Sequence, residues 1–300
     1  MEYKYIRVES LDEGMISRIS LSRPNQRNAQ NRGLLVELGH AFEAAEQDDQ
    51  VRVVILAADG PIFSAGHDLG SKASVEEREP GPNQHETMKI NGGTREGAEA
   101  RALQEWHYFF QNTLRWRNLR KITVAQVHGQ VIAAGLMLAW CCDLIVAAEK
   151  TEFCDLVGTR LGMCGMEYFA HPWEFGPRKA KELLLTSDSI DAEEAYRLGM
   201  VSKIFPQDEL AERTLTFARR IAKLPTMAAL MIKESVNQSV DNMGFYNALQ
   251  ACFTIHQLNH SHWAEVHTEG EFKGYPAATV AEGATDWRNP PPILPARKDV

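Results

Sequence analysis

Apolar side chains follow strand-like and helix-like patterns along the N-terminal part of the chain. They alternate with polar ones over residues 1–22, on either side of a turn at residues 12–14, which predicts a hairpin of two strands. Residues 30–48 carry apolar side chains at helical spacing, and the β-branched run at residues 51–57 predicts a buried strand. A strand, a helix and another buried strand in succession are typical of a βαβ-type layer.

The later part of the chain predicts more helices and short strands. A helix is expected over residues 102–119 and a strand over residues 122–127. After Gly135, an apolar helix runs into a strand near Asp143. The pattern then predicts a Gly-rich loop at 158–165, helices at 166–186 and 191–198, a strand at 201–206, and helices at 207–223 and 226–260.

Two segments stand apart from these elements. In residues 70–101 apolar side chains almost vanish, which is typical of a long polar insertion that either lines a binding site or is disordered. The end of the chain is Pro-rich and cannot be helical. We therefore expect one domain, with a core over residues 1–205, a C-terminal helical part over 206–265, and a tail over 266–300.

Composition and charge narrow the function classes. The 300 residues are 44% hydrophobic and 24% charged, as in ordinary globular proteins. A formal net charge of −8 disfavours a nucleic-acid-binding protein. No apolar run approaches the ~20 residues of a membrane helix. The N-terminus also lacks the apolar stretch of a secretory signal. We expect a cytoplasmic protein.

Cysteine and histidine usage favours neither disulfides nor a metal. The five cysteines are odd in number and two of them are adjacent, so free thiols are expected. Four histidines fall close together near the end of the last predicted helix, and His256 and His260 share a helical face. Zinc would need a third ligand, which the local sequence does not offer. We interpret this group as surface histidines and expect no metal site. The group consists of His256, His260, His262 and His267.

Two segments of small residues are candidates for backbone chemistry. Residues 63–69 follow the strand at 51–57, and residues 128–136 precede a predicted helix. Unpaired backbone N–H groups in such turns can bind an anionic oxygen. If the two turns meet, two N–H groups could converge on one oxygen as an oxyanion hole.

The order and spacing of these segments resemble the crotonase superfamily, also called the enoyl-CoA hydratase/isomerase family. Each matching piece is short, but together they span roughly residues 5–265. They are residues 19–29 (ISLSRPNQRNA), 53–56 (VVIL), 63–68 (FSAGHD), 122–129 (ITVAQVHG), 134–135 (AG), 142–147 (CDLIVA), 176–180 (GPRKA), 185–186 (LT), 192–199 (AEEAYRLG) and 201–204 (VSKI).

The resemblance implies an α/β fold of repeated ββα turns, with two nearly perpendicular sheets and C-terminal helices used in trimerisation. It implies a homotrimer or dimer of trimers, and an acyl-CoA thioester as ligand. Coenzyme A then arrives with the substrate, and no other cofactor is expected. The polar insertion at 70–101 would shape the acyl pocket.

The resemblance also implies site residues. The backbone N–H groups of His67 and Ala134 would form the oxyanion hole. Arg27 would lie near the nucleotide, where it could meet a phosphate, although a solvated arginine fits this position equally well. The substrate or coenzyme A would contact Arg27, Ala29, Ser64, Ala65, Gly66, Asp68, Gly135 and Met137.

The sequence departs from the family where hydratases carry two catalytic glutamates. Met137 and Val157 occupy those positions, and neither side chain can transfer a proton. Glu167 and Asp155 are the candidate replacements. A helix-terminal carboxylate is the alternative role for Glu167, and a capping or surface carboxylate for Asp155. The His67 imidazole is a further candidate base, and Asp68 is expected to brace the turn.

These observations predict an enzyme of the enoyl-CoA hydratase/isomerase type, a lyase or isomerase that stabilises a thioester enolate. Isomerisation needs a single base and fits the remaining groups better than hydration by two glutamates. The alternative is a non-catalytic acyl-CoA binding subunit of the same fold.

Overall fold

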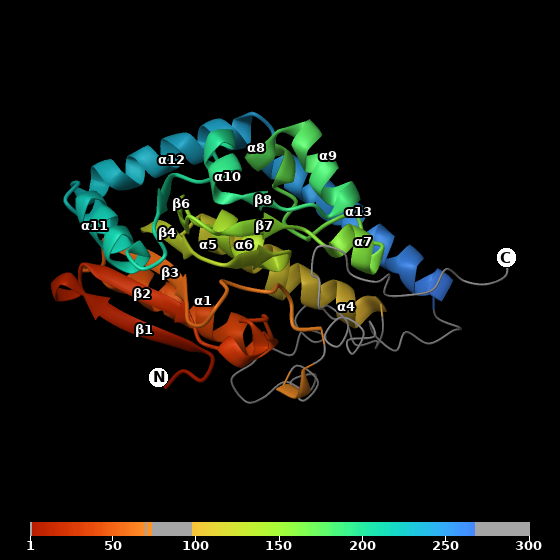
Figure 1. Ribbon diagram of the computed structural model, residues 1–300, viewed down its shortest axis with the longest axis horizontal. Coiled ribbons are helices and arrows are strands. Elements are labelled where there is room, and N and C mark those ends of the chain that lie inside the picture. The colour runs from red at the N-terminus through yellow and green to blue at the C-terminus, as the bar shows by residue number, and fades with distance from the viewer. Residues whose placement is uncertain (1, 70, 74–97, 268–300) are drawn as a thin grey trace.

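The computed structural model describes residues 2–69, 71–73 and 98–267, which form two sheets surrounded by helices (Figure 1). The larger sheet has the strand order β1-β2-β3-β4-β6-β9. β1 and β2 form the predicted antiparallel hairpin, and the other neighbours pair in parallel. The strands are β1 (Ile6–Leu11), β2 (Ile16–Leu21), β3 (Val53–Ala58), β4 (Ile122–Val127), β6 (Leu144–Ala148) and β9 (Lys203–Phe205).

The larger sheet is covered on both faces, as the unbroken apolar run of β3 predicts. Val54 and Leu56 belong to the main core with the side chains of α1 (Arg32–Gln47). Val53 and Ile55 point to the other face and pack with side chains of α11 (Leu210–Ala222). Because side chains alternate along a strand, β3 contributes side chains to the hydrophobic cores on both faces of the sheet.

A second, smaller sheet carries the order β5-β7-β8. Its strands are β5 (Gln130–Ile132), β7 (Glu152–Cys154) and β8 (Ile190–Asp191). The residue pattern did not predict these strands, because two or three residues are too few to show an alternation. The resemblance, by contrast, implied two sheets, and it is confirmed on this point.

One long helical segment follows the polar insertion. It consists of α4 (Ala98–Gln104), a π-helical stretch η3 (Glu105–Gln111) and α5 (Asn112–Arg117). The helix predicted at 102–119 is confirmed, but it begins earlier, so residues 98–101 of the predicted polar insertion are helical. Residues 70 and 74–97 of that insertion lie outside the described residues. A π stretch inside a helix frequently accompanies a functional site.

The helices around the second sheet differ from the pattern in three places. α7 (Val157–Leu161) covers the first part of the Gly-rich loop predicted at 158–165. The helix predicted at 166–186 is two, α8 (His171–Phe175) and α9 (Pro177–Thr186), separated by Gly176 at φ +76°. The helix predicted at 226–260 is also two, α12 (Thr226–Asn242) and α13 (Phe245–His267), because Gly244 takes φ +103°.

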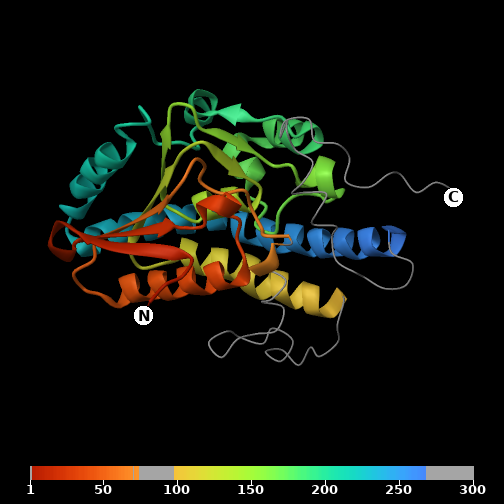
Figure 2. The same ribbon diagram turned by 60° about the horizontal axis from the view of Figure 1, so that its bottom comes forward.

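The remaining predicted elements are confirmed as α6 (Ala134–Trp140), α10 (Ala192–Leu198) and α11. In Figure 2, α13 lies alongside the helical segment that contains α4 and η3. Of the predicted tail, residues 268–300 lie outside the described residues. Among the helices of the described ranges, none combines the length and apolar character that crossing a membrane requires.

Candidate functional site

The two small-residue turns meet, which is the arrangement that an oxyanion hole between them requires. Ser64 and Val131 form an isolated parallel bridge, and the Ile132 N–H donates to the Ser64 carbonyl at 3.0 Å. A Cβ on Gly66 would lie 3.0 Å from the Ile132 carbonyl oxygen and 3.3 Å from the Ala134 nitrogen. A Cβ on Gly135 would lie 2.8 Å from the Ser64 carbonyl oxygen. Glycine at both positions therefore permits the close approach of the two backbones.

Two backbone N–H groups remain available where these turns meet. Gln30 pairs with the residues on either side of His67, accepting from Asp68 at 3.0 Å and donating to the Gly66 carbonyl at 2.8 Å. Within the described ranges, the His67 N–H donates to no protein group. The same holds for the N–H of Ala134, which begins α6 and has no partner within the helix.

Ala133 holds the second of these N–H groups in place through an unusual backbone conformation. Its φ of 47° and ψ of −118° belong to a region that residues with a Cβ rarely adopt. The Ala133 N–H donates to the Cys154 carbonyl at 2.9 Å, which ties the turn to β7. Such local strain is commonly found at functional sites, where the surrounding structure maintains it.

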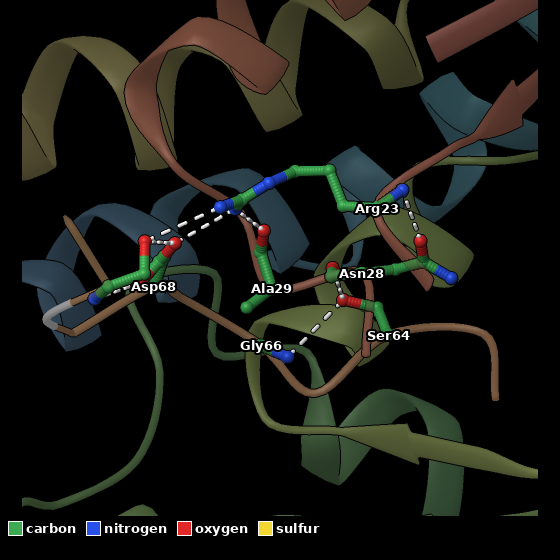
Figure 3. Close-up of polar contacts among 7 residues, drawn as sticks. Arg23, Asn28, Ala29, Ser64, Gly66 and Asp68 are labelled. Atoms are coloured by element: carbon green, nitrogen blue, oxygen red, sulfur yellow. Dashed lines mark hydrogen bonds and ion pairs between the residues drawn. The ribbon is translucent and has the colours of Figure 1, made fainter. Parts of the chain in front are cut away.

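An ion pair between Arg23 and Asp68 holds the first turn in place (Figure 3). Asp68 accepts from Arg23 at 2.8 Å and from the Ser71 hydroxyl at 2.6 Å. Burial raises the pKa of Asp68, but the hydrogen bonds from Ser71 and Arg23 outweigh it and hold the pKa below its usual value. The Arg23 guanidinium also donates to the Ala29 carbonyl. This arrangement matches the bracing role expected of Asp68.

Ser64 ties the same turn to the loop before α1. Its hydroxyl donates to the Asn28 carbonyl at 2.9 Å and accepts from the Gly66 N–H at 3.2 Å (Figure 3). The Ala65 N–H donates to the Arg27 carbonyl at 3.0 Å. The structure therefore brings together the predicted coenzyme A contacts of both segments, and the Arg27 side chain is exposed beside them.

Glu167 lies directly beside the first turn. Its Oε2 is 3.1 Å from Nε2 of His67, and the His67 ring stacks on Phe109 of the π stretch η3. Burial would raise the pKa of Glu167, but the interactions with His67 and His256 outweigh it and lower the pKa to about 2. Glu167 is therefore a buried carboxylate, 4% exposed, and ionised at neutral pH.

The interpretation of His256 and His260 as surface histidines was wrong. They are 2% and 5% exposed, because α13 packs them against η3. His256 Nε2 lies 3.7 Å from Glu167 Oε1 and 3.6 Å from Glu105 Oε2, and His260 Nε2 lies 3.2 Å from Glu105 Oε1. His262 is exposed as predicted, and nothing is described of the His267 side chain.

The charges in this cluster are set by burial and by the neighbouring groups. Burial raises the pKa of Glu105. Burial lowers the pKa of His256, but its contacts with Cys164 and Glu105 and the charge of Glu167 raise it to about 11. Burial and the charge of His256 lower the pKa of His260 to about 3. The cluster thus holds one charged and one neutral imidazole at neutral pH.

Asp155, the other candidate carboxylate, is enclosed. Its Oδ2 lies 3.0 Å from His171 Nε2, and its Oδ1 accepts from the Val157 N–H at 2.8 Å. The two side chains are 1% and 0% exposed. Asp155 therefore has a partner on each oxygen, and the contact with Val157 is the capping type of role that the sequence left open.

Met137 and Val157, which the resemblance aligns with the two glutamates of hydratases, are both packed against the main core. Met137 lies in α6 and is buried in the main core, and Val157 begins α7 and packs partly against that core. The sequence carried no direct signal for Glu105, which contacts His256 and His260 from η3. The i,i+4 spacing of the two histidines was an indirect signal, but it lies about 150 residues further along the chain.

Comparisons with known proteins agree with this fold. The family model described as enoyl-CoA hydratase/isomerase matches residues 12–91 and 88–271. The candidate enoyl-CoA hydratase EchA13 of Mycobacterium tuberculosis is 67% identical over 297 residues, covering 99% of this chain and 92% of that protein. The mitochondrial enoyl-CoA hydratase of Pongo abelii is 30% identical, covering 80% of this chain and 75% of that protein.

A solved structure shows the same architecture. The crystal structure of a probable enoyl-CoA hydratase from Mycobacterium smegmatis superposes with a TM-score of 0.77 at 41% identity, covering 88% of this chain and 97% of that one. The fold is that of the crotonases. The chain belongs to the enoyl-CoA hydratase/isomerase family, as the resemblance predicted.

Proposed function

We propose that this protein acts on an acyl-CoA thioester by stabilising its enolate, and that it isomerises an enoyl double bond. The observation that carries the proposal is the pair of available N–H groups, on His67 and Ala134, with the Glu167 carboxylate beside them. Two N–H groups directed at one thioester oxygen would bind the negative charge that develops there in the transition state.

The proposed chemistry needs one proton acceptor. Glu167 takes a proton from the α-carbon, the C–H electron pair moves into the thioester, and the enolate oxygen is held by the two N–H groups. The same carboxylic acid then returns the proton to the γ-carbon, which shifts the double bond. A carboxylate with so low a pKa is a weak base, so enolate stabilisation must supply most of the rate enhancement.

Hydration by the two-glutamate route is less well supported. It needs one group to activate water and another to protonate the α-carbon. Met137 and Val157 supply neither, and both oxygens of Asp155 already have partners inside the protein. We therefore assign the proton transfer to Glu167 rather than to Asp155, with Ser64, Ala65, Gly66 and the exposed Arg27 on the coenzyme A side.

The deciding experiment mixes the protein with a short and a long trans-3-enoyl-CoA in D2O. We expect the absorbance of the conjugated enoyl thioester to appear. As the Glu167 proton exchanges with D2O, NMR should show deuterium at the γ-carbon of the product and at the α-carbon of recovered substrate. With trans-2-enoyl-CoA, we expect little loss of that absorbance through hydration. Rapid hydration without isomerisation would contradict the proposal.

The same experiment separates the enzyme from a non-catalytic subunit. Binding of both thioesters with no deuterium exchange and no double-bond shift would establish the acyl-CoA binding subunit instead. If neither thioester binds, as measured by calorimetry, the assignment of the ligand fails.

We also propose that α12 and α13 join copies of the chain into a trimer or a dimer of trimers. Large apolar side chains on these helices are exposed, which is typical of an interaction surface. Light scattering coupled to size exclusion should give three or six times the chain mass, and a monomer would contradict the proposal. The exposed side chains are Met227, Met231, Ile232, Val236, Met243, Tyr246, Ile255 and Leu258.

A further inference from the structure

A buried cluster of carboxylates and imidazoles adjoins Glu167. Glu167 itself lies beside the first of the two small-residue turns, residues 63–69 and 128–136, which are called the oxyanion turns after the role proposed for them. The cluster joins η3 to α13 through Glu105, His256 and His260. One donor atom from each of these three residues lies within 4.8 Å of the other two. The proposed isomerisation uses none of the three, so the cluster calls for a separate explanation.

We propose that Glu105, His256 and His260 form a binding site for a divalent transition-metal ion. His256 and His260 are four residues apart on α13, so both imidazoles project from one face of the helix toward Glu105. The sequence lacked a third ligand for this pair, and the fold supplies it from η3. Two imidazoles and one carboxylate form a donor set that suits zinc and similar ions, whereas Mg²⁺ and Ca²⁺ prefer oxygen ligands.

The contacts of His256 fit the coordination of a metal ion better than they fit direct ion pairs with the neighbouring carboxylates. Its Nε2 is buried and has no hydrogen-bond partner among the residues that the structure describes, although it points at two carboxylates. The distances of 3.6 Å to Glu105 and 3.7 Å to Glu167 are too long for a good hydrogen bond. They are close to the ~3.3 Å that separates ligand atoms around a tetrahedral zinc ion with bonds of ~2.0 Å.

Hydrogen bonds with neighbouring groups fix the orientation of two of the three proposed ligands, as is common around metal sites. The Nδ1–H of His256 donates to the Gly165 carbonyl at 2.8 Å, which leaves Nε2 facing the cluster. The Gln257 amide donates to Glu105. Such outer contacts fix the tautomer of a ligand imidazole and the position of a ligand carboxylate.

Metal binding by the full-length protein tests this proposal without any activity measurement. The protein is dialysed against a chelator and titrated with Co²⁺, followed by visible absorption, and with Zn²⁺, followed by calorimetry. We expect one site per chain. X-ray absorption of the Zn²⁺-loaded protein should detect two imidazole ligands. Absence of saturable binding at ~100 µM metal, or a spectrum with oxygen ligands alone, would overturn the proposal.

Variants locate the site, and His262 provides the matched control. Glu105→Gln and His260→Gln should each weaken Zn²⁺ binding at least tenfold. His262→Gln, which changes an exposed histidine of the same helix, should leave it unchanged. Circular dichroism checks that each variant is folded. If a variant fails to fold, the ligand count from X-ray absorption of the unaltered protein still decides. If the three variants and the unaltered protein bind Zn²⁺ with equal affinity, the assignment of these ligands is wrong.

This inference and the proposed function fail separately. The metal titration requires no acyl-CoA, and the deuterium experiment requires no added metal. If the protein isomerises the thioester and binds no Zn²⁺, the proposed function stands and the metal site is ruled out.

Discussion

Two of the buried carboxylate–imidazole pairs in the described residues have nearly the same geometry and different surroundings. The oxygen–nitrogen distance is 3.0 Å between Asp155 and His171 and 3.1 Å between Glu167 and His67. The first pair is completely enclosed, and the His171 ring packs against Trp140. In the second pair, the His67 side chain keeps 16% of its surface exposed.

The difference teaches that a short carboxylate–imidazole contact does not by itself define a reactive site. Both oxygens of Asp155 are occupied within the protein, and an enclosed pair cannot touch a substrate. Glu167 borders the turn that carries an available N–H group, so a ligand bound there would lie next to it. Position relative to the oxyanion turns, rather than the pairing, distinguishes the two carboxylates.

The largest effect is expected for Glu167→Gln. Glutamine keeps the size of the side chain and removes the proton acceptor, so isomerisation should slow by about 10²–10⁴-fold. Thioester affinity should change little. Steady-state kinetics and calorimetry measure the two quantities, and Glu182→Gln, at an exposed carboxylate on α9, serves as the control. Unchanged turnover would remove Glu167 from the mechanism.

The next largest effect is expected when the oxyanion turns are disturbed and both pairs are left intact. In Gly135→Ala, the new Cβ would lie 2.8 Å from the Ser64 carbonyl oxygen, so the two turns must separate. Losing one oxyanion donor typically costs about 10²–10³-fold in turnover. We expect a loss of that size in the deuterium-exchange assay. Full activity in a folded Gly135→Ala protein would show that the two turns need not meet.

Asp155→Asn should act on stability instead of turnover. The change replaces one carboxylate oxygen in a fully buried contact with His171 and the Val157 N–H, which should lower the free energy of unfolding by about 1–3 kcal/mol. Turnover per folded molecule should stay within about tenfold of the original. Urea unfolding and an activity assay on the same sample separate the two effects. A stable Asp155→Asn protein with strongly reduced turnover would reverse the roles of the two carboxylates.

The smallest effect is expected for the pair that braces the first turn. The pKa of Asp68 is lower in the folded protein than in the unfolded chain, so its ionised form stabilises the fold. This stabilisation is complete above the unfolded pKa of about 3.9 and disappears as the pH falls through the folded pKa. Asp68→Asn should therefore show a shallower loss of stability in acid, measured by thermal unfolding at several pH values. Parallel curves for the two proteins would contradict this role.

The long elements and the paired turns were predictable because their signals are local or repeated. The β-branched run of β3 and the apolar spacing of α1 each suffice to predict an element. The glycine breaks at Gly176 and Gly244 were missed, since apolar spacing continues across both. Among the candidate site residues, His67, Ala134 and Glu167 were found through the family resemblance, and the structure brings them to one place.

The sequence by itself determined the family and the two small-residue turns, and it has Met137 and Val157 where the resemblance implies two glutamates. These are properties of residue type and order, and they need no knowledge of distance. Only the tertiary structure decided which carboxylate lies beside the oxyanion turn, and that His256 and His260 are buried against Glu105. Those relations depend on α13 packing against η3, and contacts between residues so far apart in the chain leave no periodic signal in the sequence.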